Sequence, residues 1–236
     1  MTETATRPPI EVGLVADLAC PWCYLGLVRL DRARAMRPHL RVRLRWWPFF
    51  LNPHMPPEGM DRQSYLRTKF GGEAAARGIY ERIVASGRAD GVEFAFERMT
   101  RTPNTLLAHR LILFADQQDH AEAAIRALFR ALFLDGRDIG LREELVEIGA
   151  AAGLDSTALG SFLAGDRCRS EVVAAHRRAE RLGVHGVPVF VVDDRHVIAG
   201  AQPAEVLVGL LDLAGSARKS ADAQQQDARK AAAPVD

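Results

Sequence analysis

Two of the three cysteines in the chain lie three positions apart, in the segment ADLACPWCYLG at residues 16–26. Pro21 and Trp22 stand between Cys20 and Cys23. Cysteines with this spacing can ligate a metal, form a structural disulfide, or exchange electrons with another molecule as a working dithiol. Each chemistry needs different neighbours, so the rest of the sequence can help to choose among the three.

The elements on either side of the pair predict where each thiol lies. Residues 10–18 are β-rich and indicate a buried strand, and from Pro21 the apolar spacing becomes helical until Pro38. Proline is favoured in the first turn of a helix, so Cys20 should precede the helix and Cys23 should lie one turn inside it. The partial positive charge at a helix N-terminus favours a thiolate. We therefore expect Cys20 to be the exposed nucleophile and Cys23 the buried thiol that resolves the mixed disulfide.

The two other interpretations of the pair have less support. A disulfide that closes so short a loop removes little entropy from the unfolded chain. Structural zinc usually requires a second close pair of ligands, whereas Cys168 stands alone and the seven histidines show no ligand spacing. A redox pair is favoured and no metal is expected, with zinc as the remaining alternative. Cys168 is interpreted as a structural or incidental thiol.

Side chains near the pair also allow two interpretations. Trp22 could be a core aromatic residue, but between two cysteines at a helix tip it is expected to be exposed and to offer apolar area to a substrate. His109, His176 and His185 are interpreted as ordinary helix or loop residues rather than catalytic bases.

The remaining elements are predicted in a simple order. Residues 41–48 alternate between arginine and apolar side chains, which is typical of a strand with one solvated face. About a hundred mostly helical residues follow, including a helix expected to start at Thr102 and Pro103. Two short strands (GVPVFVVDD and RHVIAG) and a last helix to Gly215 complete the order, and residues 216–236 are expected to be a disordered tail.

Composition limits the partners and the compartment. Apolar residues make up 48% of the 236 residues, which is enough for a substantial core, and 31 basic side chains nearly balance 30 acidic ones. This balance argues against binding to nucleic acid or to an acidic membrane. The sequence has no apolar run of membrane-spanning length, and its polar start is unlike a secretory signal. We therefore expect a protein of the reducing cytoplasm, where structural disulfides are rare.

The chain resembles the thioredoxin superfamily, and more narrowly the DsbA-like, FrnE-type oxidoreductases that are related to 2-hydroxychromene-2-carboxylate isomerase and kappa-class glutathione transferases. The resemblance is carried by DLACPWCYLG, GVPVFVV and GAQPAEVL, with PFFLNPHMPPEG and NTLLAHRL as further similar segments. It implies an α/β thioredoxin-like fold with an all-helical domain inserted after the second strand. The implied domains are residues 8–58 and 184–215 for the thioredoxin fold, and residues 59–183 for the helical insertion.

The resemblance also implies residue roles. Pro188 is expected to form a cis peptide bond that faces the dithiol, and the backbone of Val187 is expected to pair with an extended substrate. Pro21, Trp22, Val187 and Pro188 are thus the predicted substrate-binding residues. Well-known DsbA proteins are periplasmic and carry a histidine between the two cysteines, whereas this chain has Pro21 and Trp22. A strongly oxidising character is therefore not carried over.

The prediction is a cytoplasmic thiol–disulfide oxidoreductase in which Cys20 attacks and Cys23 resolves. Its expected partners are a disulfide-bearing protein or small molecule and a cellular thiol reductant. No bound cofactor is expected, glutathione is a candidate co-substrate, and the protein is expected to be a monomer or a homodimer. Two alternatives stay open. One is a glutathione-dependent isomerase or transferase, although such relatives generally use a serine where this chain has Cys20. The other is a client-binding chaperone without catalysis.

Overall fold

A four-stranded sheet forms the centre of the computed structural model, which describes residues 8–231, with side chains for residues 8–218. The strand order is β2-β1-β5-β6. β1 pairs in parallel with β2 and antiparallel with β5, and β5 pairs antiparallel with β6. The strands are β1 (Ile10–Ala16), β2 (Val42–Pro48), β5 (Val189–Val192) and β6 (His196–Ala199).

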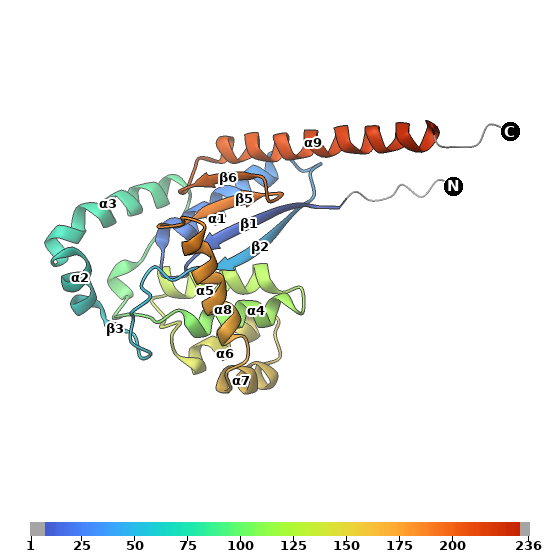
Figure 1. Ribbon diagram of the computed structural model, residues 1–236. Coiled ribbons are helices and arrows are strands. Elements are labelled where there is room, and N and C mark those ends of the chain that lie inside the picture. Colours follow the sequence, from blue (N-terminus) through green and yellow to red (C-terminus); the bar gives the residue numbers. More distant parts are fainter. Residues whose placement is uncertain (1–7, 232–236) are drawn as a thin grey trace.

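Helices cover both faces of this sheet (Figure 1). α1 (Pro21–Ala35) and α9 (Ala204–Ala231) pack together on one face, against Val12 and Leu14 of β1 and Phe190 of β5. The opposite face carries Val15 and Val189, which pack with Ala179 of α8 (Arg169–Arg181). The alternation of side chains along each strand therefore fills two separate apolar layers.

The long segment between β2 and β5 is almost entirely helical. It contains α2 (Arg62–Phe70), α3 (Glu73–Ala89), a 3₁₀ turn (Phe96–Arg98), α4 (Leu106–Asp116), α5 (Ala121–Phe133), α6 (Arg142–Ala151), α7 (Ser156–Ala164) and α8. The predicted fold class, a thioredoxin-like sheet with helices inserted after its second strand, is confirmed. Figure 1 shows α2 and α3 beyond the end of the sheet to which β1 and β2 point.

The helix expected from Thr102 begins later, at Leu106, so that prediction is wrong. Arg101 and Thr102 instead form the short strand β4 (Arg101–Thr102), which pairs with β3 (Met60–Asp61). The Asn104 side chain then accepts a hydrogen bond from the Leu106 N–H (3.0 Å). The sequence could not predict this strand pair, because its two halves lie far apart in the chain.

The disordered tail expected over residues 216–236 is also corrected, because α9 continues from Ala204 to Ala231. Alanine, glutamine, lysine and arginine all favour helix, and no proline interrupts the segment before Pro234. Low hydrophobicity was therefore a poor guide to disorder here. Residues 232–236 lie outside the described residues.

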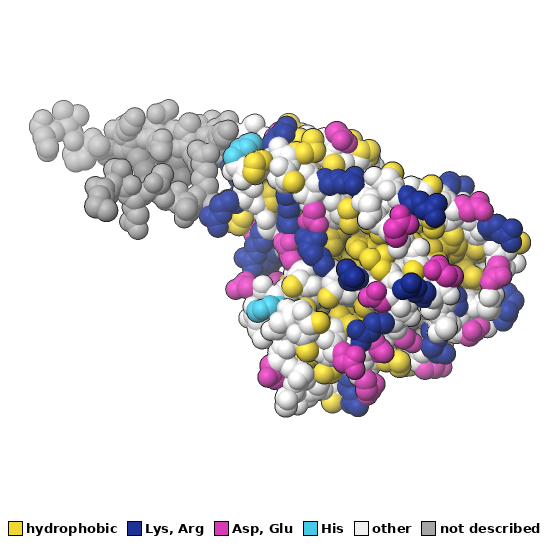
Figure 2. Space-filling view, turned by 180° about the vertical axis from the view of Figure 1, so that it is seen from behind, with side chains coloured by type: hydrophobic (Ala, Val, Ile, Leu, Met, Phe, Trp, Pro, Cys, Tyr) yellow, Lys and Arg dark blue, Asp and Glu magenta, His cyan; other side chains and the backbone are white. Residues whose placement is uncertain are grey.

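The surface carries both signs of charge side by side. Figure 2 shows basic and acidic side chains interspersed on one face of the molecule, with hydrophobic side chains between them. This agrees with the formal net charge of +1. Among residues 8–231, no helix is both long and apolar enough to cross a membrane.

Candidate active site

The start of α1 holds both cysteines of the CPWC segment. Cys20 is the N-cap residue, with extended backbone angles, and Pro21 occupies the first helical position. The Cys20 N–H donates to the Asp17 carbonyl (3.1 Å), and the Cys23 N–H donates to the Cys20 carbonyl (3.0 Å). Both thiols are free and lie beside one another at the positive end of the helix.

Cys20 is less accessible than its position in the sequence predicts. Its exposed fraction is only 3%, so the expectation of an exposed Cys20 is wrong, whereas Cys23, at 0%, is buried as expected. The segment before β5 forms part of the cover over Cys20, because the Val187 carbonyl oxygen lies 3.6 Å from the Cys20 Sγ. That segment is remote in sequence, so the local helix pattern could not reveal it.

The covering segment contains a cis peptide bond between Val187 and Pro188. Pro188 is buried and Val187 is half-buried. The Pro188 carbonyl accepts a hydrogen bond from Gly200 N–H (2.8 Å), which ties the segment to the end of β6. The structure thus brings Val187 and Pro188 to the cysteine pair, as the sequence resemblance implies.

Trp22 does not stand out into solvent as expected. It is half-buried and packs against the main core, and Pro21 beside it is also half-buried. The indole therefore contributes packing as well as surface next to the thiols. A small cavity of about 20 Å³ adjoins Pro21 and is lined by aromatic side chains and by Arg62 of α2.

The surroundings of Cys23 favour its protonated form. Burial raises the pKa of the Cys23 thiol well above its usual range, and the hydrogen bond and charge of Cys20 raise it further. A hydrogen bond to the Asp17 backbone acts in the opposite direction but is weaker. Cys23 therefore holds its proton firmly.

Sequence reasoning missed a buried acid next to this pair. Asp17, at the end of β1, is 1% exposed, and its carboxylate faces His109 of α4, with Oδ1 and Nε2 3.4 Å apart. The Asp17 carboxylate also accepts the Leu51 N–H (2.7 Å). Burial raises the pKa of Asp17, but the contact with His109 and the hydrogen bond from the Leu51 N–H outweigh it, so the pKa is lowered overall.

His109 joins this acid to the sheet. The ring is fully buried, and its Nδ1 accepts a hydrogen bond from the Trp46 indole N–H (3.0 Å). Since Nδ1 accepts, the ring proton lies on Nε2, the nitrogen that faces Asp17. An aspartate three positions before Cys20 was the one signal in the sequence. Nothing local paired it with a histidine on a distant helix.

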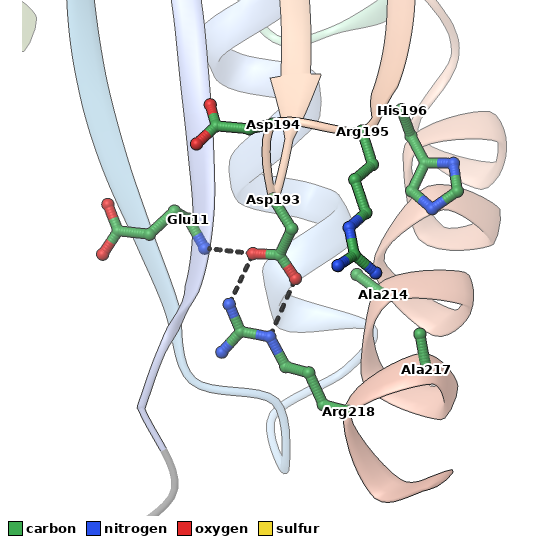
Figure 3. Close-up of a pocket in the computed structure, with 8 residues that line it drawn as sticks. All are labelled: Glu11, Asp193, Asp194, Arg195, His196, Ala214, Ala217 and Arg218. Atoms are coloured by element: carbon green, nitrogen blue, oxygen red, sulfur yellow. Dashed lines mark hydrogen bonds and ion pairs between the residues drawn. The ribbon is translucent and has the colours of Figure 1, made fainter. Parts of the chain in front are cut away.

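Other candidate residues lie elsewhere. Cys168 is half-buried at the start of α8, and residues 8–231 contain no cluster of three or more potential metal ligands. A cavity of about 370 Å³ lies at the far end of the sheet, near Glu11 at the start of β1 (Figure 3). There Arg218 binds the Asp193 carboxylate (2.8 Å). This cavity is separate from the thiols, because the thiols follow the opposite end of β1.

A thiol pair at the head of a helix, faced by a cis-proline segment on a β2-β1-β5-β6 sheet, defines an enzyme with a thioredoxin fold. The sequence profile of the DSBA-like thioredoxin domain matches residues 11–212, and the chain belongs to this family.

Solved structures agree with this assignment. A probable DsbA oxidoreductase from Streptomyces coelicolor is 33% identical, with a TM-score of 0.75 over 88% of this chain and 90% of that one. A 2-hydroxychromene-2-carboxylate isomerase is 18% identical, with a TM-score of 0.62 over 90% and 98%. The cytosolic disulfide reductase DsbM of Pseudomonas aeruginosa, also solved with GSH, is 21% identical, with a TM-score of 0.59 over 86% and 99%. The last two show similarity of fold.

Proposed function

We propose that the protein is a thiol–disulfide oxidoreductase in which Cys20 is the attacking thiol and Cys23 the resolving thiol. The observation that supports this most strongly is the pairing of two free thiols at the head of α1 with the Val187 carbonyl 3.6 Å from the Cys20 Sγ. Membership of the DSBA-like family and the 33% identity to a probable DsbA oxidoreductase support it further.

The proposed reaction conserves electrons and protons in two steps. The Cys20 thiolate attacks one sulfur of a substrate disulfide, forms a mixed disulfide and releases the first substrate thiol. Cys23 then loses its proton and attacks the Cys20 sulfur, which releases the second substrate thiol and leaves a Cys20–Cys23 disulfide. A cellular thiol, with glutathione as the candidate, would restore the dithiol by the reverse exchange.

Substrate contacts are assigned to Pro21, Trp22, Val187 and Pro188, which surround Cys20. Val187 is half-buried next to the thiol, so its backbone could pair with an extended polypeptide without refolding of the segment. The half-buried Trp22 and Pro21 would supply apolar contact. The boundaries 59–183 for the helical domain, and a cytoplasmic site of action like that of DsbM, belong to the same proposal.

Cysteine variants test this function. Cys20→Ser should abolish the reduction of insulin by the protein with dithiothreitol or glutathione, because no nucleophile remains. Cys23→Ser should trap the mixed disulfide with the substrate, while Cys168→Ser, the matched control, should keep wild-type activity. Retained insulin reduction by Cys20→Ser would overturn the proposal.

The same cysteine variants distinguish a thiol–disulfide oxidoreductase from a glutathione-dependent isomerase. An isomerase needs no resolving thiol, so full turnover of a chromene carboxylate by Cys23→Ser would favour that reaction. Our proposal predicts that Cys23→Ser turns over no disulfide substrate.

A further inference from the structure

Gly26 occupies a position in α1 where a side chain would meet the active-site segment. A glycine inside a helix is less stable than alanine, so its presence in a buried turn has to be explained by space. A Cβ atom at Gly26 would lie 3.1 Å from Phe190 Cζ and 3.2 Å from Pro188 Cγ. Both distances are shorter than ordinary carbon–carbon contacts.

Both neighbours are held by the surrounding structure. Phe190 belongs to β5 and is 0% exposed, so its ring is enclosed by core side chains on all sides. Pro188 is buried, its ring is part of the backbone, and its carbonyl is bound to Gly200 N–H at 2.8 Å. A methyl group at position 26 would therefore push α1 and the Val187–Pro188 segment apart by a few tenths of an ångström.

This separation would reach Cys20 directly. α1 carries Cys20 at its N-cap, and the residue before Pro188 places its carbonyl oxygen 3.6 Å from the Cys20 Sγ. The same two elements meet at Gly26, because α1 carries both Gly26 and Cys20, and the cis-proline segment carries both Pro188 and Val187. The close approach at Gly26 and the cover over Cys20 are thus parts of one packing arrangement.

We propose that Gly26 is a positioning residue: the absence of a side chain there lets the Val187–Pro188 segment close over Cys20 and fixes the gap through which the sulfur meets a substrate disulfide. The packing part of the proposal stands on geometry alone. Its consequence for disulfide exchange rests on the proposed function.

Gly26→Ala tests the proposal, with Gly209→Ala as the matched control. Gly209 lies in α9, and a Cβ there would meet nothing within 4 Å. In the reduced, folded Gly26→Ala variant at fixed pH, Cys20 should react with iodoacetamide about fivefold faster than in wild type, because its cover is displaced. Its rate of exchange with insulin should fall by about tenfold, because Val187 no longer aligns the substrate.

The alkylation rate of Cys20 tests the packing role of Gly26, and the rate of exchange with insulin tests its consequence for the proposed function. Gly209→Ala should match wild type in both, and a Gly26→Ala variant within about twofold of Gly209→Ala in its alkylation rate would overturn the proposal. If even the wild-type protein exchanges no disulfide, the proposed function fails, while the alkylation difference still tests the role of Gly26.

A second variant covers the case in which Gly26→Ala does not fold. Phe190→Leu removes the ring atoms closest to the added methyl group. The double variant Gly26→Ala/Phe190→Leu should then fold, as Phe190→Leu alone does. Because the contact with Pro188 Cγ remains, its Cys20 should still be alkylated faster than in Phe190→Leu alone. Equal alkylation rates in these two variants would overturn the proposal.

Discussion

At the scale of single residues, the least expected feature is an ionised carboxylate inside the protein next to the thiols. Asp17 keeps its charge because His109 and the Leu51 N–H face it, although burial alone would neutralise it. The imidazole is in turn oriented by the Trp46 indole. Asp17 directly follows β1, Trp46 lies in β2 and His109 in α4, so one small network joins the sheet to the helical segment.

Asp17→Asn should therefore destabilise the protein at neutral pH. Removing one partner of a buried, hydrogen-bonded charge leaves the others unpaired, and we expect a loss of about 3 kcal/mol in the free energy of unfolding. Urea denaturation at pH 7 measures it, with the exposed Asp116→Asn as the control. A loss at Asp17 no larger than at Asp116 would contradict the proposed network.

The same network predicts the direction of a pH dependence. The folded-state pKa of Asp17 lies below its unfolded value, so its stabilisation is complete above the unfolded pKa of about 3.9 and is lost as the pH falls through the folded pKa. The difference in unfolding free energy between wild type and Asp17→Asn should shrink as the pH is lowered from 5 toward 3. The total decrease should be about 1.4 kcal/mol for each unit by which folding lowers the pKa of Asp17. A difference that stays constant over this range would show that the pKa of Asp17 is the same in the folded and the unfolded protein, and one that grows would show that folding raises it.

At the scale of elements, α1 is held in place by charged side chains as well as by its apolar face. Arg29 donates to Asp90 (2.7 Å) at the end of α3 and to Ser86 (2.7 Å), and it also bonds the Ala201 carbonyl after β6. The Asp90 carboxyl is only 7% exposed, so this pair lies largely out of water. One arginine thus fixes the cysteine-bearing helix against both the helical segment and the sheet.

Arg29→Ala should lower the free energy of unfolding by about 2 kcal/mol, because it leaves Asp90 with Arg32 alone and removes bonds to Ser86 and Ala201. Arg88→Ala is the matched control nearby. Its ion pair with Glu93 joins side chains that are 68% and 77% exposed, and its loss should change stability by less than about 0.5 kcal/mol. Thermal or urea unfolding compares the two, and equal effects would show that the Arg29 contacts add no more than a surface pair.

At the scale of the whole molecule, the sequence predicts those parts that depend on local patterns. The alternation in β2 places Leu44 and Trp46 inside and Arg43 and Arg45 outside, as the structure has them. Cysteine spacing and Pro21 place the pair at a helix start. The sequence could not predict the contacts between residues that lie far apart in the chain. These are the contact of Val187 with Cys20, the contact of Asp17 with His109, and the pairing of β3 with β4.

The proposed function requires that Cys20 and Cys23 act as one redox pair, and a redox titration tests this most directly. The purified protein is equilibrated in glutathione or dithiothreitol buffers, and alkylation mass shifts report each cysteine. We expect a single two-electron transition in which both thiols disappear together and Cys168 stays reduced, with about 30 mV for each tenfold change in the equilibrium constant. Independent oxidation of Cys20 and Cys23, or the absence of any transition, would contradict it.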